Sequence, residues 1–230
     1  MKENITRSGN IQYPVAERFL SINGEGPRAG CLAAFIRMKG CNLNCSYCDT
    51  SWANREDCPC TFYSLKGLLS WLGTAGAACV TLTGGEPLLT PGIADLIEGI
   101  GAAGFQLEIE SNGSIDITPF HVLPHRPAFT LDYKCPDSGM EEFMNTDNYA
   151  LLQQEDTVKF VAGSIRDLDR AFEIDRTYDL GSRCHVFLSA VFGKISPEQI
   201  VEYMISHQWK TARLQLQMHK FIWPPDRKGV

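Results

Sequence analysis

Short runs of apolar and β-branched residues recur along the chain, separated by stretches in which apolar residues have helical spacing. The short runs predict strands at residues 15–19, 32–38, 79–82, 106–110, 128–133, 156–162, 185–191 and 212–218. The stretches between them predict helices at residues 65–72, 93–100, 164–176 and 196–207, and one within 140–154. Strands that alternate with helices form parallel βαβ units, so the pattern indicates an α/β fold, either a barrel or an open doubly wound sheet.

Two of the predicted helices carry recognisable start signals. Ser164 and Asp167 form an N-cap pair for the helix that ends near residue 176. Ser196, Pro197 and Gln199 supply an N-cap, a proline in the first turn and a capping-box glutamine for the helix that ends near residue 207.

Unusual polar motifs follow the predicted strands directly. They are the cysteine-rich loop 41–48, the Gly-Gly-Glu-Pro at 84–87, the Ser-Asn-Gly at 111–113, the Lys-Cys-Pro at 134–136, and His219. In a parallel α/β fold the carboxyl ends of the strands share one rim, and active sites lie at that rim. The sequence therefore predicts that these distant motifs line one site.

Three cysteines are crowded into the loop after the second predicted strand. Cys41, Cys45 and Cys48 have three and two residues between them, a spacing that lets a tight loop turn three sulfurs onto one inorganic cluster. A 4Fe-4S cluster held by three thiolates keeps an open coordination position on one iron, which can bind a substrate or cofactor. The alternative is a zinc site in which Cys58 or Cys60 provides the fourth thiolate.

Composition and charge narrow the class of protein. The 230 residues suit one domain, with a core at about residues 15–218 and a C-terminal tail at 219–230. Hydrophobic residues make up 44% and charged residues 21%, as in soluble globular proteins, and no apolar run of about 18 residues predicts a membrane span. A net charge of −6 argues against an extended basic surface for nucleic acid.

The cysteine content and the N-terminus indicate the compartment. Residues 1–13 are polar and lack the apolar region of a secretory signal, so a cytoplasmic location is expected. Nine cysteines, an odd number, favour metal or redox chemistry over a disulfide framework. Cys31, Cys79 and Cys184 lie in or beside apolar runs and are expected to pack as small hydrophobic residues.

The cysteine loop, with Tyr47 directly before its last cysteine, resembles the signature of the radical S-adenosylmethionine (radical SAM) superfamily. The Gly-Gly-Glu-Pro at 84–87 resembles the second motif of that superfamily, which binds the amino group of S-adenosylmethionine, and glycine lets backbone approach a ligand closely. The resemblance implies a partial TIM-like barrel of parallel strands. It also implies a 4Fe-4S cluster whose open iron chelates S-adenosylmethionine and whose electron cleaves it to a 5'-deoxyadenosyl radical.

Further segments resemble one family within that superfamily, the 7-carboxy-7-deazaguanine synthases. These segments are Asn-Gly-Glu-Gly at 23–26, residues 35–42 leading into the cysteine loop, Cys-Asp-Thr at 48–50, and His-Lys-Phe-Ile-Trp at 219–223. The resemblance implies conversion of 6-carboxy-5,6,7,8-tetrahydropterin to 7-carboxy-7-deazaguanine with loss of ammonia by radical ring contraction. This reaction serves the biosynthesis of queuosine and other 7-deazapurines and uses Mg²⁺, a cation that prefers oxygen ligands.

The same resemblance assigns residues to each ligand. The metal ligands would be Cys41, Cys45 and Cys48 for the cluster and Thr50 for Mg²⁺. The residues bordering S-adenosylmethionine would be Tyr47, Cys48, Asp49, Gly85, Asp132, Tyr133 and Lys134. The residues facing the pterin would be Ile22, Asn23, Gly24, Glu25, Arg37 and Thr83.

The residue types leave some of these roles open. The guanidinium of Arg37 fits either a substrate carboxylate or an internal ion pair with a carboxylate such as Glu110. Lys134 could meet the cofactor or be solvated, and His219 could be structural. The family often has glutamine where this chain has Asn23, and some members place a C-terminal proline carboxylate in the pocket, whereas five residues follow Pro225 here.

The resemblance implies an electron donor such as flavodoxin and a homodimer, without direct contact to nucleic acid or membrane. Two other functions share some of the same features. A glycyl-radical-enzyme activase uses the same cysteine spacing but acts on a protein backbone. A non-catalytic zinc-binding module would need only the thiolates.

Overall fold

The structure is a computed structural model that describes residues 11–224 and 227–229. Two expectations from the sequence lie wholly or partly outside the described residues. They concern the N-terminal segment, of which residues 1–10 are not described, and the tail, of which residues 225, 226 and 230 are not described.

The described strands all belong to one sheet, in the order β3-β1-β2-β4-β5-β6-β7-β8-β9. Their bounds are β1 (Tyr13–Ile22), β2 (Leu32–Met38), β3 (Thr61–Tyr63), β4 (Cys79–Gly84), β5 (Gln106–Ser111), β6 (Ala128–Tyr133), β7 (Thr157–Ala162), β8 (His185–Ala190) and β9 (Ala212–Leu214). Every pair from β2 through β4 to β9 is parallel. The first and last strands in this order do not pair, so the barrel is open, and the predicted partial barrel is confirmed.

The β2 edge of the sheet carries an antiparallel extension that the sequence did not predict. β1 pairs antiparallel with β2, and β3 pairs antiparallel with β1. Because only a short loop separates β1 from β2, the chain has no room there for the helix that a parallel crossover needs.

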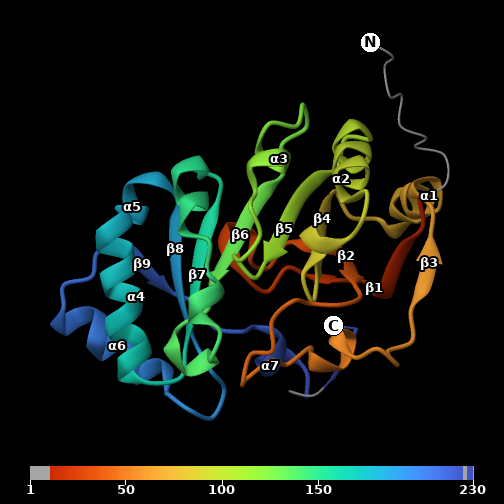
Figure 1. The fold of residues 1–230 in the computed structure, drawn as a ribbon. Coiled ribbons are helices and arrows are strands. Elements are labelled where there is room, and N and C mark those ends of the chain that lie inside the picture. Colours follow the sequence, from red (N-terminus) through yellow and green to blue (C-terminus); the bar gives the residue numbers. More distant parts are fainter. Residues whose placement is uncertain (1–10, 225–226, 230) are drawn as a thin grey trace.

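Helices lie along the outer side of the curved sheet, with α1 and α2 toward one end and α4, α5 and α6 toward the other (Figure 1). Their bounds are α1 (Leu65–Ala75), α2 (Ile93–Ala102), α3 (Thr118–His121), α4 (Ile165–Tyr178), α5 (Leu180–Arg183), α6 (Pro197–Ser206) and α7 (His219–Ile222). Both predicted N-caps are confirmed. Ser164 accepts a hydrogen bond from the backbone of Asp167, and Ser196 and Gln199 form a complete capping box.

The expectation of a helix within 140–154 is wrong, because this segment forms short 3-10 turns, Glu141–Phe143 and Thr146–Leu151. The side chain of Asn145 accepts from the backbone of Asp147, and Asn148 donates to the carbonyl of Ile115. Such side-chain bonds offer the backbone an alternative to a continuous helix.

The last strand is shorter than the predicted 212–218, since β9 ends at Leu214. β9 is an edge strand that pairs only with β8, and Leu216 beyond it is exposed. The tail then turns into α7, so His219 begins a short helix and does not directly follow a strand.

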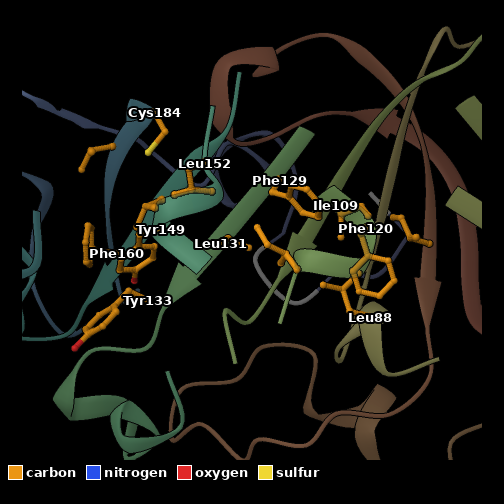
Figure 2. Packing of buried hydrophobic residues seen from close by; sticks show 14 of the residues in the cluster. Leu88, Ile109, Phe120, Phe129, Leu131, Tyr133, Tyr149, Leu152, Phe160 and Cys184 are labelled. Atoms are coloured by element: carbon orange, nitrogen blue, oxygen red, sulfur yellow. The ribbon is translucent and has the colours of Figure 1, made fainter. Parts of the chain in front are cut away.

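The two faces of the sheet differ in character. The outer face packs against the helices in a continuous apolar core, part of which is shown in Figure 2. The inner face carries polar and charged side chains, among them Thr81, Glu108, Thr130 and Lys159. In the part of the chain that the structure describes, no helix has the length and apolar character needed to cross a membrane.

Candidate functional site

A cavity of about 510 Å³ opens at the carboxyl ends of the parallel strands, a size typical of small-molecule sites. The cysteine-bearing loop after β2 and helix α7 lie at this same end of the sheet (Figure 1). The cavity brings together Ile22, Gly24, Glu25, Arg37, Cys41, Cys45, Tyr47, Cys48, Asp49, Thr50, Thr83, Gly85, Asp132 and Lys134. Fourteen candidate residues from distant parts of the sequence therefore line one site.

Two predicted residues, Asn23 and Tyr133, do not line the cavity. Asn23 is buried beneath it, and its side-chain amide donates to Glu108 Oε2 at 2.8 Å. Tyr133 lies on the outer face of β6, packed against Phe160 with ring centroids 5.5 Å apart (Figure 2). Strand alternation explains this placement, because Asp132 and Lys134 point into the cavity and the residue between them must point away.

The three predicted cluster cysteines are free thiols that all face the cavity. Cys41 Sγ is approached by the backbone N–H of Leu43 at 3.4 Å and by Asn112 Nδ2 at 3.5 Å. Hydrogen bonds to sulfur are one of the means by which a protein sets the reduction potential of an iron-sulfur cluster. The donor set therefore fits a cluster held by three thiolates.

Burial disfavours the ionised form of two of the three thiols. Burial raises the pKa of Cys41 and of Cys45, although Lys134 acts in the opposite direction on Cys45. Thiolate is the form that binds iron, so metal ions must offset the effect of burial when a cluster assembles.

The zinc alternative finds no support in the geometry. Within residues 11–224 and 227–229, no three His, Cys, Asp or Glu side chains converge on one ion position, the three cluster cysteines included, so this finding bears equally on zinc and on the cluster. Cys58 is buried with its thiol donating to the carbonyl of Pro59 at 3.3 Å, and neither Cys58 nor Cys60 lines the cavity. Of the remaining predicted cysteines, Cys184 is buried as expected, whereas Cys31 is exposed because it lies in the loop before β2.

The Gly-Gly-Glu-Pro motif holds the end of β4 against the cysteine loop. A Cβ on Gly85 would lie 2.1 Å from the carbonyl oxygen of Gly40, and one on Gly84 would lie 2.4 Å from that of Met38. The same Gly40 carbonyl accepts the backbone N–H of Glu86 at 2.8 Å. Glycine is therefore required at residues 84 and 85 for contact between two protein segments, in addition to any approach to a ligand.

Glu86 is fully buried and ties the motif to the end of β5. Its carboxylate accepts hydrogen bonds from the backbone of Leu88 at 3.0 Å, the backbone of Asn112 at 2.7 Å and Ser111 Oγ at 3.1 Å. Burial raises the pKa of Glu86 to about 7, despite these hydrogen bonds, which lower it.

We expect stability to depend on pH through Glu86. A carboxyl whose folded pKa lies above its unfolded value of 4.5 contributes stability that is full below pH 4.5 and is lost as pH rises through about 7. The loss should be on the order of 2 kcal/mol between pH 5 and pH 8. Urea unfolding at several pH values should show this slope in the wild type and a flatter one in Glu86→Gln. Equal slopes in the two proteins would show that Glu86 is not the source of the pH dependence.

Arg37 lines the cavity and makes an ion pair there, so the predicted internal ion pair is present, and contact with a substrate carboxylate stays a prediction. Its partner is Glu17, with Arg37 Nε 2.8 Å from Glu17 Oε1. The partner that the sequence suggested was Glu110. Glu17 and Arg37 are direct cross-strand neighbours on β1 and β2. The sequence could not show this because β1 was expected to be part of a parallel sheet.

Lys159 on β7 is the main cavity residue that the sequence analysis missed. Its ammonium forms ion pairs with Glu25 and with Asp132, the latter at 3.1 Å, and Asp132 also binds Lys134 at 2.8 Å. Burial alone would lower the pKa of Lys159, but Asp132 and Glu25 hold it well above its usual value. A lysine between the apolar residues Val158 and Phe160 of a predicted strand was the available signal.

Lys159 therefore joins the loop predicted to hold the substrate to the strand predicted to hold the cofactor. Burial raises the pKa of the neighbouring Glu110, and the negative charge of Glu25 raises it further. Burial alone would raise the pKa of Asp132, but the two lysines lower it below its usual range.

The C-terminal region also contributes side chains to the wall of the cavity. His219 lines the cavity, and burial lowers its pKa. Described residues of the tail, Arg227 and Lys228, lie at the cavity as well, with Lys228 Nζ 4.2 Å from the ring centre of Trp52. Trp52 and Asn54, on the 3-10 turn after the cysteine loop, are further lining residues that the sequence did not indicate.

Comparison with known sequences and structures agrees with this arrangement. A 7-carboxy-7-deazaguanine synthase of Clostridium acetobutylicum is 46% identical over 221 residues, covering 96% of this chain and 100% of the relative. One from Methanospirillum hungatei is 36% identical over 217 residues, covering 92% of this chain and 86% of the relative. The crystal structure of QueE from Escherichia coli has the same fold, with a TM-score of 0.73 and 24% identity over 94% of this chain and 98% of that one.

The family model of the Radical SAM superfamily matches residues 35–123, the segment that contains the cysteine loop and the Gly-Gly-Glu-Pro motif. The full-length relatives extend the likeness to both ends of the sheet. The chain therefore belongs to the 7-carboxy-7-deazaguanine synthase family of the radical SAM superfamily.

Proposed function

We propose that this protein converts 6-carboxy-5,6,7,8-tetrahydropterin to 7-carboxy-7-deazaguanine with loss of ammonia, in the biosynthesis of queuosine and related 7-deazapurines. The observation that carries the proposal is the single cavity that contains three free cysteines and the basic side chains of Arg37 and Lys134. The full-length relatives that bear this enzyme name support it.

Membership of the superfamily implies a 4Fe-4S cluster and S-adenosylmethionine. Cys41, Cys45 and Cys48 would hold the cluster, which, together with S-adenosylmethionine, supplies radical chemistry at the substrate. Gly85 presents bare backbone to the cavity, and Asp132 and Lys134 offer a hydrogen-bond acceptor and a cation for the polar groups of S-adenosylmethionine. The protein contributes position, orientation and exclusion of competing reactions.

The substrate would occupy the part of the cavity between β1, β2 and the loop after β1. Ile22, Gly24 and Glu25 present that loop, and Thr83 adds a buried hydroxyl. Arg37 would bind the substrate carboxylate, because a guanidinium offers several donors in a planar fork that matches a carboxylate.

We also propose Mg²⁺ at Thr50, whose hydroxyl lines the cavity next to the cysteine loop. An oxygen ligand suits this hard cation, and a Mg²⁺ bound there could also take an oxygen of the substrate carboxylate. Thr50 makes no side-chain capping bond to the 3-10 turn that follows it, and its hydroxyl lies 3.7 Å from Cys48 Sγ, beside the predicted cluster ligands.

Thr50→Ala is expected to raise the Mg²⁺ concentration for half-maximal activation by about 10-fold, because one oxygen ligand is lost. Titration of activity with Mg²⁺ measures this shift. Thr74→Ala, at an exposed hydroxyl on α1, is the matched control and should leave the titration unchanged. An unchanged Mg²⁺ response in Thr50→Ala would remove Thr50 from the metal site.

The remaining parts of the proposal concern the protein's surroundings. A reduced cluster needs an external electron donor, for which a flavodoxin is suitable, and a homodimer is the proposed assembly. The free cysteines at the site require a reducing compartment, which supports a cytoplasmic location. We further propose that residues 1–230 form one domain, since the described strands share one sheet.

The test is anaerobic incubation of cluster-loaded protein with 6-carboxytetrahydropterin, S-adenosylmethionine, Mg²⁺ and a reductant, with the product identified by mass. The expected result is 7-carboxy-7-deazaguanine and one equivalent of ammonia, with S-adenosylmethionine not consumed. Absence of this product from protein with a full complement of iron and sulfide would refute the proposal.

A further inference from the structure

We propose that Glu17 is a positioning residue, which holds the guanidinium of Arg37 in the orientation that receives the substrate carboxylate. This inference rests on the proposed function and adds to it a residue on β1. The two side chains form an ion pair at 2.8 Å in the wall of the cavity, and both are partly buried.

The first argument comes from a β-bulge in β1. Val15 pairs with Met38 and Glu17 pairs with Arg37, so Ala16 has no partner on β2. In an unbroken antiparallel ladder the residue opposite Arg37 would be Ala16, and Glu17 would lie on the other face of the sheet. The bulge is therefore what places Glu17 beside Arg37, and bulges often redirect side chains next to active sites.

The neighbouring residues confirm that the strand changes face at this point. Before the bulge, Tyr13 and Val15 lie in the apolar core on the outer side of the sheet. After it, Phe19 points inward and stacks on Phe35, with ring centroids 4.9 Å apart, while Arg18 points outward over the ring of Tyr63. A single inserted residue thus exchanges which side chains of β1 face the inner side of the sheet and which face the outer side.

The second argument comes from the geometry of the ion pair. Glu17 accepts from Nε of Arg37, the nitrogen nearest the aliphatic stem. The two terminal nitrogens of Arg37 have no hydrogen-bond partner among the described residues. A guanidinium has several donors in fixed directions, so a contact at Nε aims the terminal nitrogens while leaving them available to a ligand.

The third argument is the cost of leaving Arg37 unrestrained. An arginine side chain has many rotamers, and a group that binds a reacting substrate must hold its geometry closely. Glu17 supplies this restraint from the adjacent strand. An ion pair that served only to stabilise the sheet would not need to lie in the cavity wall or to leave the binding edge of the arginine free.

The test is a double-mutant cycle that is read in two ways, by turnover and by ligand binding. Glu17→Ala should lower kcat/KM for 6-carboxytetrahydropterin about 10-fold, because Arg37 loses its restraint. Glu17→Gln keeps an oxygen that accepts from Nε and should remain within about 3-fold of the wild type. In an Arg37→Met background, Glu17→Ala should change kcat/KM by less than about 2-fold, since there is no guanidinium left to position.

The binding measurement uses two unreactive ligands, 6-carboxypterin and pterin, with cluster-loaded protein that contains S-adenosylmethionine. Glu17→Ala should weaken binding of 6-carboxypterin about 10-fold but leave binding of pterin, which lacks the carboxylate, within about 2-fold. Glu202→Ala removes the same charge at an exposed position on α6 and should change neither.

Equal losses for the two ligands, or an additive loss in the Arg37→Met background, would show that Glu17 acts only on the structure and would overturn the inference. Wild-type protein that binds 6-carboxypterin no better than pterin and forms no deazaguanine product would instead refute the proposed function, and the inference with it. The wild-type measurements therefore separate the two failures.

Discussion

Replacement of Cys45 by alanine should remove the iron-sulfur cluster and reduce turnover by at least about 10³-fold. Only Cys41 and Cys48 would then face the cavity, so the cluster would have two thiolate ligands. No other cysteine of the described residues lines the cavity, so none can replace the third ligand. Iron and sulfide analysis, the visible absorption of the cluster and product formation all measure the effect.

Cys31→Ala is the matched control, because Cys31 is also a free and accessible thiol but lies outside the cavity. Its iron content and turnover should equal those of the wild type. A Cys45→Ala protein that retained both cluster and turnover would show that Cys45 is not a ligand. The assignment of the cluster to these three cysteines would then be wrong.

Gly85→Ala should have the second largest effect, a fall in kcat/KM of about 100-fold. The added Cβ would meet the carbonyl oxygen of Gly40 at 2.1 Å and Asn54 Oδ1 at 2.3 Å, and the first of these is backbone that cannot turn aside. The end of β4 and the cysteine loop must therefore move apart, which displaces the cluster from the substrate. Overpacking of this kind also costs about 1–3 kcal/mol of stability.

Gly73→Ala is the control for this change, since the new Cβ would meet nothing within 4 Å at an exposed position on α1. Alanine favours a helix over glycine by about 0.5–1 kcal/mol, so this variant should be slightly more stable than the wild type and equally active. Steady-state kinetics and urea unfolding of the two variants give the comparison. Wild-type kinetics in Gly85→Ala would mean that the contact between β4 and the cysteine loop has no role in the site.

The elements that the sequence predicted well are those whose signals are local. The strands from 32–38 to 185–191 carry apolar residues on their outer face and are bounded by clear turns. The helix starts at Ser164 and Ser196 follow from capping chemistry that involves a few adjacent residues. The gathering of the motifs at the rim of the barrel was predictable for the same reason. A motif that directly follows a parallel strand must lie at that strand's carboxyl end.

The parts that the sequence did not show depend on contacts between distant residues. The partner of Arg37 could not be found without the antiparallel pairing of β1 and the bulge at Ala16, which together decide that Glu17 faces inward. The position of Lys159 between Glu25 and Asp132 likewise depends on which strands are neighbours. Motif position alone assigned Asn23 and Tyr133 to the site, whereas strand and loop geometry turns both side chains away from it.

The central claim is that three cysteines hold a cluster with one iron left free for S-adenosylmethionine. Electron-nuclear double resonance on the reduced, cluster-loaded protein tests it most directly, with S-adenosylmethionine labelled at its amino nitrogen and carboxylate oxygen. The account predicts strong coupling of both labels to one iron, lost when S-adenosylmethionine is omitted. A permanent fourth protein ligand on that iron, or tetrahedral zinc in place of the cluster, would contradict it.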